Sequence, residues 1–487
     1  MPSAPPRPGA ALRPRHLTML GLGGAIGSGL FVGSGLGISG AGPAVLLCYV
    51  LAGALTVLVM RMLGELASAS PDGGSFSVYA ARAFGRGAGF TVGWLHWWTL
   101  CVAVAAESTA SSGILHSWCP AVPAWGFALV VMVFFTGLNL TAVGMFGEFE
   151  FWFAGIKVAA VVLFLAVGSL AVCGALPGVR APGMANLTGH GGFLPHGWVA
   201  VAAGFTSVLA SFGGMEVVTI AAAETADPAA SVARAVRSTV WRILLFFVGS
   251  VALIVMLVPW DSAAVGRGPF SATLDRLGMA GAGPVMDAVV LLALLSALNA
   301  NLYGAARMVR SLAARGEAPR ALAAGSPGGT PRVAVLLSSG VGFGAVLLGL
   351  WQPDTVFRFL VQSVGATMLY VWLAIAGSHV RLRGRGADRT DPASVRMWGS
   401  PWLPRAVVAF LAGTLVLMAL TPGSRPQMLT TTALTAALAT VAGLRALHAR
   451  RRSSRIAPTG PAVPPAGPAP AAVAPAAQRT EETPAAG

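Results

Sequence analysis

The stretch GLGGAIGSGLF, residues 21–31, decides how this chain can fold. It lies in an apolar segment long enough to cross a bilayer, yet five of its eleven residues are glycine. Glycine weakens a helix, and backbone groups freed in mid-membrane are tolerated only against protein or in a water-lined cavity. A second cluster, SFGGMEVV at 211–218, interrupts a later apolar segment. The alternative for either cluster is close helix packing, which small residues also permit.

Composition places both clusters in a membrane. The mean hydropathy is +0.73, with 55% hydrophobic and 10% charged residues, which is outside the range of soluble globular proteins. Runs of about 20 apolar residues recur, each long enough to span a bilayer as a helix. The sequence therefore predicts an all-α polytopic membrane protein with twelve transmembrane helices. We expect these spans near 17–38, 42–66, 88–115, 122–143, 147–175, 198–225, 237–259, 283–311, 332–351, 354–381, 402–420 and 426–447.

The two glycine clusters open expected spans one and six, in the similarly long segments 17–175 and 198–381. Paired interrupted helices in corresponding positions of two halves indicate inverted repeats with a substrate site near the bilayer midplane. We therefore interpret both clusters as broken helices. Two peripheral helices would follow at 402–447. The N-terminal segment 1–16 and the Pro/Ala-rich tail 448–487 would lie outside the bilayer, with the tail disordered.

Arginine is distributed asymmetrically over the expected loops. The outer loops hold only Arg180, Arg267, Arg276 and Arg425, whereas the other loops and the termini hold most of the rest. This bias predicts a plasma-membrane protein with both termini in the cytoplasm. The net charge of +15 then orients the protein in the lipid bilayer and implies no nucleic-acid partner.

Several kinds of chemistry have no support in the sequence. The four cysteines, Cys48, Cys101, Cys119 and Cys173, show no paired spacing, and the seven histidines are scattered, so we expect no metal and no cofactor. The alternative for Cys119 and Cys173, both near the outer face, is a disulfide. We find neither a nucleophile–base constellation nor a phosphate-binding loop, which argues against an enzyme and against ATP-driven transport.

Several motifs carry a family resemblance. RHLTMLGLGGAIGSGLFVGSG, MRMLGELASASPDGGSFSVYA, FGEFEFWFAGIKV and EVVTIAAAETADP occur in this order. The chain resembles bacterial amino acid permeases of the amino acid–polyamine–organocation superfamily from about residue 15 to 447. The strings GEFEFW, VRSTVWRI and RMWGSPW are most similar to 4-aminobutyrate permeases, although neighbouring branches share most of them. The resemblance implies a leucine-transporter-type fold of two inverted five-helix repeats and two peripheral helices.

The broken helices predict where an amino acid binds. A half-helix N-terminus offers backbone N–H groups and a favourable dipole to a carboxylate. We assign this role to Gly27, Ser28 and Gly29, with Ala25 and Ile26 in the same stretch. Carbonyl groups at Ser211, Phe212 and Gly213 suit the ammonium group, and the resemblance implies that place for it. Phe212 also resembles the family's aromatic gate, and ordinary packing is the alternative.

Two intramembrane carboxylates are candidate site residues, because a charge in the membrane is expensive. Glu216 lies one turn beyond the second break and could line the site, support the broken helix or take part in gating. Glu107 lies deep in expected span three and could contact the distal group of the substrate or relay a proton. A structural role is the alternative for both. Arg61 and Glu65, by contrast, form an i,i+4 pair typical of a solvated or interfacial helix end.

Lys157 is the only lysine among 32 basic residues. It follows Glu148 by nine residues, about 13 Å along a helix, which is too deep for simple snorkelling. Arginine stays charged, whereas a buried lysine can release its proton. We therefore interpret Lys157 as a proton-coupling residue, with a permanently charged strut as the alternative. The resemblance places its ammonium near Gly23 and Ser296, bridging spans one, five and eight.

These observations predict a secondary active transporter that imports an amino acid with a proton by alternating access. An exchanger of the same fold is the main alternative, and a non-transporting sensor is another. The resemblance favours 4-aminobutyrate or another ω-amino acid as substrate. A neutral or aromatic L-amino acid remains the competing expectation.

Overall fold

The computed structural model describes residues 26–69, 76–141, 146–179, 181–214, 228–322, 331–383 and 395–456. Within these ranges the chain is helical and contains no strand. The first half contains η1 (Gly29–Gly33), α2 (Ser34–Ala41), η2 (Gly42–Ala44), α3 (Val45–Ala69), α4 (Phe76–Phe84), α5 (Arg86–Trp118), α6 (Ala124–Thr141), α7 (Phe146–Val172), α8 (Ala185–Thr188) and α9 (Gly197–Ala210). The second half contains α11 (Pro228–Arg242), η3 (Ile243–Gly249), α12 (Ser250–Leu257), α13 (Ala263–Arg267), α14 (Pro269–Arg276), α15 (Ala282–Ala314), η4 (Arg320–Leu322), α16 (Arg332–Gly349), α17 (Pro353–Arg383), α18 (Trp402–Leu420) and α19 (Arg425–Ile456).

Ten of the described helical segments are long and apolar enough to cross a membrane, so the chain is a multi-pass membrane protein. Expected spans one and two count as one segment, Gly29–Ala69, because η1, α2, η2 and α3 follow one another without a gap. A bend separates α2 from η2 at Gly42, whose φ of 64° favours glycine. Expected span six is represented by α9, which at 14 residues is too short to cross.

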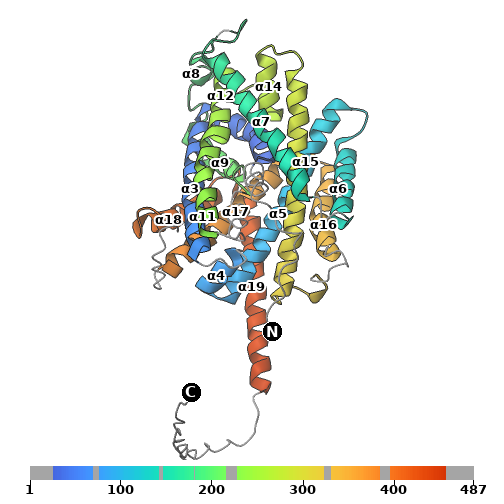
Figure 1. Cartoon of the computed structure of the whole chain (residues 1–487), viewed down its shortest axis with the longest axis vertical. Helices are drawn as coiled ribbons and strands as arrows, with labels where there is room; N and C mark the ends of the chain where they lie inside the picture. The colour runs from blue at the N-terminus through green and yellow to red at the C-terminus, as the bar shows by residue number, and fades with distance from the viewer. Residues whose placement is uncertain are drawn as a thin grey trace, which may run out of the picture. The chain divides into compact units, whose positions relative to one another are not determined.

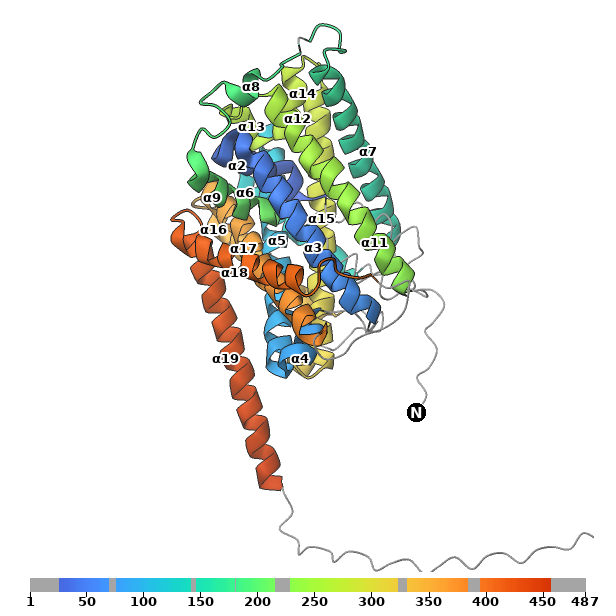
Figure 2. The ribbon, with the colours of Figure 1, turned by 90° about the vertical axis from the view of Figure 1, so that its left-hand side faces the viewer.

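Helix α5 lies at the centre of the helical bundle and packs along α4, α6, α15, α16 and α17. Figures 1 and 2 show α15 running beside α7, and these two helices are in contact. At 33 residues each, α5 and α15 reach about 50 Å, which is longer than the hydrocarbon core. The middle of each helix can therefore lie well away from either membrane surface.

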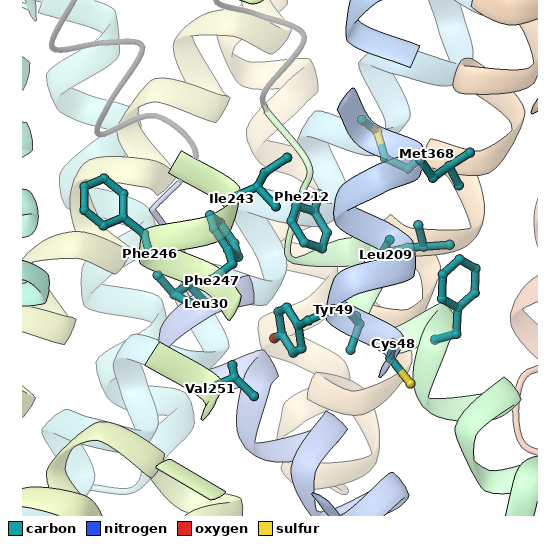
Figure 3. Close-up of a cluster of buried hydrophobic side chains, with 14 of the residues drawn as sticks. Leu30, Cys48, Tyr49, Leu209, Phe212, Ile243, Phe246, Phe247, Val251 and Met368 are labelled. Carbon is teal, nitrogen blue, oxygen red and sulfur yellow. The ribbon is translucent and has the colours of Figure 1, made fainter. Parts of the chain in front are cut away.

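A buried aromatic cluster lies beside the short helix α9. The ring of Phe212 stacks on the ring of Phe247 with 4.9 Å between the ring centroids, and the ring centroid of Tyr49 lies 5.9 Å from that of Phe212. Figure 3 shows these three side chains converging from the segment after α9, from η3 and from α3. This cluster fixes α9 against α3 and η3, and thereby places the end of α9.

The C-terminal residues 444–487 form a separate small unit. Its described part is helical to Ile456, so helix α19 continues into the first residues of the expected tail. The rest of that tail lies outside the described residues, as does the expected N-terminal segment 1–16.

Candidate functional site

Helix α9 ends within the second glycine cluster. The amides of Ser211, Phe212 and Gly213 each donate to the carbonyl three residues earlier, at 2.9–3.2 Å, so the chain forms turns instead of continuing the α-helix. Gly214 follows with a φ of +91°, a conformation that strongly favours glycine. In the described part of this segment the α-helix therefore ends at Ser211–Gly214, while Glu216 lies outside the described residues.

The first glycine cluster leads into a π-helical turn, η1, with Phe31 N–H donating to the Gly27 carbonyl at 3.3 Å. The two glycine clusters touch, because the Ser211 hydroxyl donates to the Gly29 carbonyl at 2.7 Å. A Cβ atom on Gly29 would lie 2.4 Å from Ser211 Cα, so this approach requires glycine. Gly23 and Ala25 lie outside the described residues.

A cavity of about 70 Å³ lies where these segments meet. It brings together Gly27, Ser28 and Gly29 from the first cluster, Ser211 and Gly213 from the second, and Glu107 from α5. Sequence reasoning did not single out the remaining lining residues. These are His96, Thr99, Leu100, Ala103, Ala106, Ala210, Gly214, Asn301, Val361, Val364 and Met368.

Two sequence candidates do not line this cavity. Ile26 is fully buried in the core, and Phe212 belongs to the aromatic cluster with Tyr49 and Phe247. In this structure the ring of Phe212 packs against the rings of Tyr49 and Phe247 (Figure 3).

Glu107 is 4% exposed and lies against the first broken segment. Its Oε2 accepts a hydrogen bond of 3.2 Å from Asn301 Nδ2 on α15, and its Oε1 is 3.1 Å from where a Cβ of Gly27 would lie. The carboxylate thus connects α5 and α15 with the first glycine cluster at Gly27. Asn301 is 194 residues away in sequence, so no local pattern could have identified it.

Lys157 is fully buried on α7, and Ser296 is 2% exposed on α15, the helix that packs along α7. Neither residue lines the cavity. Any influence of Lys157 on substrate binding must therefore pass through neighbouring helices.

A polar cluster outside the cavity joins α3 to α17. Glu65 accepts hydrogen bonds from His379 Nε2 at 3.0 Å, from Arg383 Nη1 at 2.7 Å and from the Met397 amide at 2.7 Å. Arg61 donates to the Arg396 carbonyl at 2.6 Å instead of forming a hydrogen bond with Glu65 in the described part of the chain. The expected solvated or interfacial i,i+4 pair thus makes further contacts with distant segments, while Glu65 still attracts Arg61 electrostatically.

Comparisons with known proteins agree with this architecture. The amino acid permease family model matches residues 16–445. A probable GABA (4-aminobutyrate) permease of Pseudomonas aeruginosa is 46% identical over 87% of this chain and 90% of its own length. The GABA permease of Escherichia coli is 43% identical over 88% of this chain and 92% of its own length. An aromatic amino acid transport protein of Corynebacterium glutamicum is 45% identical over 86% of this chain and 91% of its own length.

The matched region contains both interruptions, Glu107 and Lys157, and extends over every described helix that contributes to the cavity. The chain therefore belongs to the amino acid permease family of the amino acid–polyamine–organocation superfamily.

Proposed function

We propose that this permease is a secondary active transporter that imports a small amino acid together with a proton by alternating access. The observation that carries the proposal is the cavity between the two interrupted segments, with Glu107 in its wall. The N–H groups near Ser28 and Gly29 would bind the substrate carboxylate, and carbonyls at Ser211–Gly213 would bind its ammonium group. Glu107 would contact the substrate or relay a proton.

The size of the cavity supports a short substrate. At about 10–15 Å³ for each water-sized group, a volume of about 70 Å³ accommodates about five to seven such groups. The relatives named above transport GABA or aromatic amino acids, according to their names. A short, unbranched amino acid such as 4-aminobutyrate fits this volume better than one with an aromatic ring.

Proton coupling would depend on Lys157. A lysine buried in the bundle can exchange its proton, and a proton affects transport only if its binding favours one conformation over another. Protonation of Lys157 near Gly23 and Ser296 would bias the packing of α7 against α15 and the first broken segment. The permanently charged strut remains the alternative role.

The proposed layout consists of two inverted five-helix repeats, residues 17–175 and 198–381, followed by two peripheral helices at 402–447. Residues 1–16 and 448–487 would be cytoplasmic, and the protein would lie in the plasma membrane. The glycine clusters that contain Gly27 and Ser211 lie near the start of residues 17–175 and of residues 198–381, which supports this layout.

Uptake into proteoliposomes tests the proposal. Labelled amino acids are offered with and without an inward proton gradient, to the wild type and to Lys157→Ala. We expect the gradient to drive uptake by the wild type and to have little effect on the variant. Counterflow that ignores the gradient would establish exchange in place of symport. Full gradient-driven uptake by Lys157→Ala would exclude this residue from coupling.

A further inference from the structure

Tyr49 on α3 is fully buried and is not among the residues that line the cavity. Its ring packs in the aromatic cluster beside Phe212. Its hydroxyl oxygen lies 3.3 Å from Oγ of Ser211, which is its hydrogen-bond partner in the described part of the chain. A phenylalanine ring would pack in this cluster without burying a polar group, so the hydroxyl points to a role beyond packing.

The direction of this hydrogen bond follows from the other bond that Ser211 makes. A serine hydroxyl has one hydrogen to donate and two lone pairs that accept. Ser211 donates its hydrogen to the Gly29 carbonyl at 2.7 Å, so its Oγ accepts the hydrogen of the Tyr49 hydroxyl. Hydrogen bonds in such a chain polarise one another, and the bond from Tyr49 therefore strengthens the bond from Ser211 to Gly29.

This chain of hydrogen bonds joins three elements of the fold. Tyr49 belongs to α3, Ser211 is the residue that ends α9, and Gly29 begins η1. Ser211 and Gly29 both line the cavity, and their backbones are so close that a Cβ on Gly29 would lie 2.4 Å from Ser211 Cα. Without the bond from Tyr49, the Ser211 hydroxyl is free to rotate, and the Gly29 carbonyl then loses this donor.

We propose that Tyr49 is a positioning residue for substrate binding: its hydroxyl holds the Ser211 hydroxyl on the Gly29 carbonyl, and thereby fixes the cavity walls that the two glycine clusters form. The inference rests on the proposed transport function, in which N–H groups near Gly29 and carbonyls near Ser211 bind the two ends of an amino acid. Tyr49 acts through Ser211 and does not contact the substrate. A site whose groups are already held in place binds its ligand at a smaller ordering cost, so Tyr49 contributes to substrate affinity.

Tyr49→Phe tests this role, because it keeps the ring in the aromatic cluster and removes only the hydroxyl. Initial rates of uptake into proteoliposomes give KM and Vmax for labelled 4-aminobutyrate, or for the amino acid that the wild type takes up fastest. We expect KM to rise about fivefold, the effect of losing one hydrogen bond between neutral groups, with Vmax per folded protein changed less than twofold. A merely structural role would instead lower the melting temperature and Vmax, and leave KM unchanged.

A double-mutant cycle with Ser211→Ala tests whether Tyr49 acts through Ser211. Ser211→Ala should itself raise KM about fivefold or more, because the bond to Gly29 is lost. In this background Tyr49→Phe should change KM less than twofold, since its partner is already absent. Thermal unfolding of each purified variant identifies loss of folding, and if Ser211→Ala does not fold, the KM of folded Tyr49→Phe decides alone.

Tyr370→Phe provides a matched control. The Tyr370 hydroxyl also bonds to a hydroxyl, Oγ1 of Thr432 at 2.7 Å, and neither residue is among those that line the cavity. This variant should leave KM unchanged. An unchanged KM in folded Tyr49→Phe, or effects of Tyr49→Phe and Ser211→Ala that multiply in the double variant, would overturn the inference and leave the transport function intact. A wild type that transports no amino acid would overturn both.

Discussion

Replacing Gly29 by alanine should separate the two interrupted segments. The new Cβ would lie 2.4 Å from Ser211 Cα, 3.1 Å from Ser211 N and 3.2 Å from the Ala210 carbonyl oxygen. Ordinary carbon–carbon contacts are about 3.5–4.0 Å, so the backbones must move apart by about 1 Å or more. The hydrogen bond from Ser211 to the Gly29 carbonyl, now 2.7 Å, would then exceed hydrogen-bonding distance.

The expected cost follows from these two effects. Overpacking destabilises by about 1–3 kcal/mol, and the lost hydrogen bond adds about 1 kcal/mol. We therefore expect Gly29→Ala to lower the unfolding free energy by about 2–4 kcal/mol. Because the same atoms form the cavity wall, uptake should fall at least tenfold. Thermal unfolding of the purified protein and uptake into proteoliposomes measure the two effects.

Gly33→Ala is the matched control on the same helix. Its Cβ would find its nearest atom, the Ser28 carbonyl oxygen, at 3.4 Å, and the Ser211 hydroxyl oxygen at 3.9 Å, which are ordinary contacts. This variant should unfold and transport almost as the wild type does. The reasoning is refuted if Gly29→Ala behaves like Gly33→Ala in both measurements, since the close approach would then have no consequence.

Three further predictions concern charge and topology. Lys157→Arg keeps the charge and loses the ability to release a proton. One coupled proton allows the wild type to accumulate substrate by at most tenfold per pH unit of gradient, and the variant should accumulate little beyond equilibrium. Equal substrate accumulation by the variant and the wild type would contradict coupling through Lys157. Glu65→Gln should lower the unfolding free energy by about 2 kcal/mol, because Glu65 accepts hydrogen bonds from charged groups. Asp261→Asn, which removes the exposed pair of Asp261 with His190, should lower it by less than about 1 kcal/mol. Similar melting temperatures of the two variants would contradict this ranking. An impermeant maleimide applied to intact cells should label Cys119 and Cys173, which are exposed free thiols; protection of either would contradict its outer-face position.

The helical class and the positions of the helices could be predicted from the sequence. Apolar runs of sufficient length make transmembrane helices, whatever their partners. The bounds of α5, α6, α16 and α18 lie within a few residues of the expected spans. The first two expected spans instead form one helical segment, Gly29–Ala69, because only a short bend at Gly42 separates them.

The end of α9 and the start of η1 could also be located from local composition, because glycine affects the backbone at its own position. Residues of both glycine clusters line the cavity. His96 could have been found by following the face of α5 that carries Glu107, at intervals of three or four residues. Asn301 could not, because nothing on α15 identifies which of its polar residues turns towards α5.

The sequence by itself therefore determined the membrane helices and the position of the two glycine clusters, since hydropathy and backbone freedom are local properties. The tertiary structure decided which side chains meet. It paired Glu107 with Asn301 and left Nδ1 of His96, in the cavity wall, without a hydrogen-bond partner. It also joined Glu65 to His379 and Arg383. The physical reason is that the rotation and crossing of packed helices depend on many weak contacts between distant segments, which no local pattern contains.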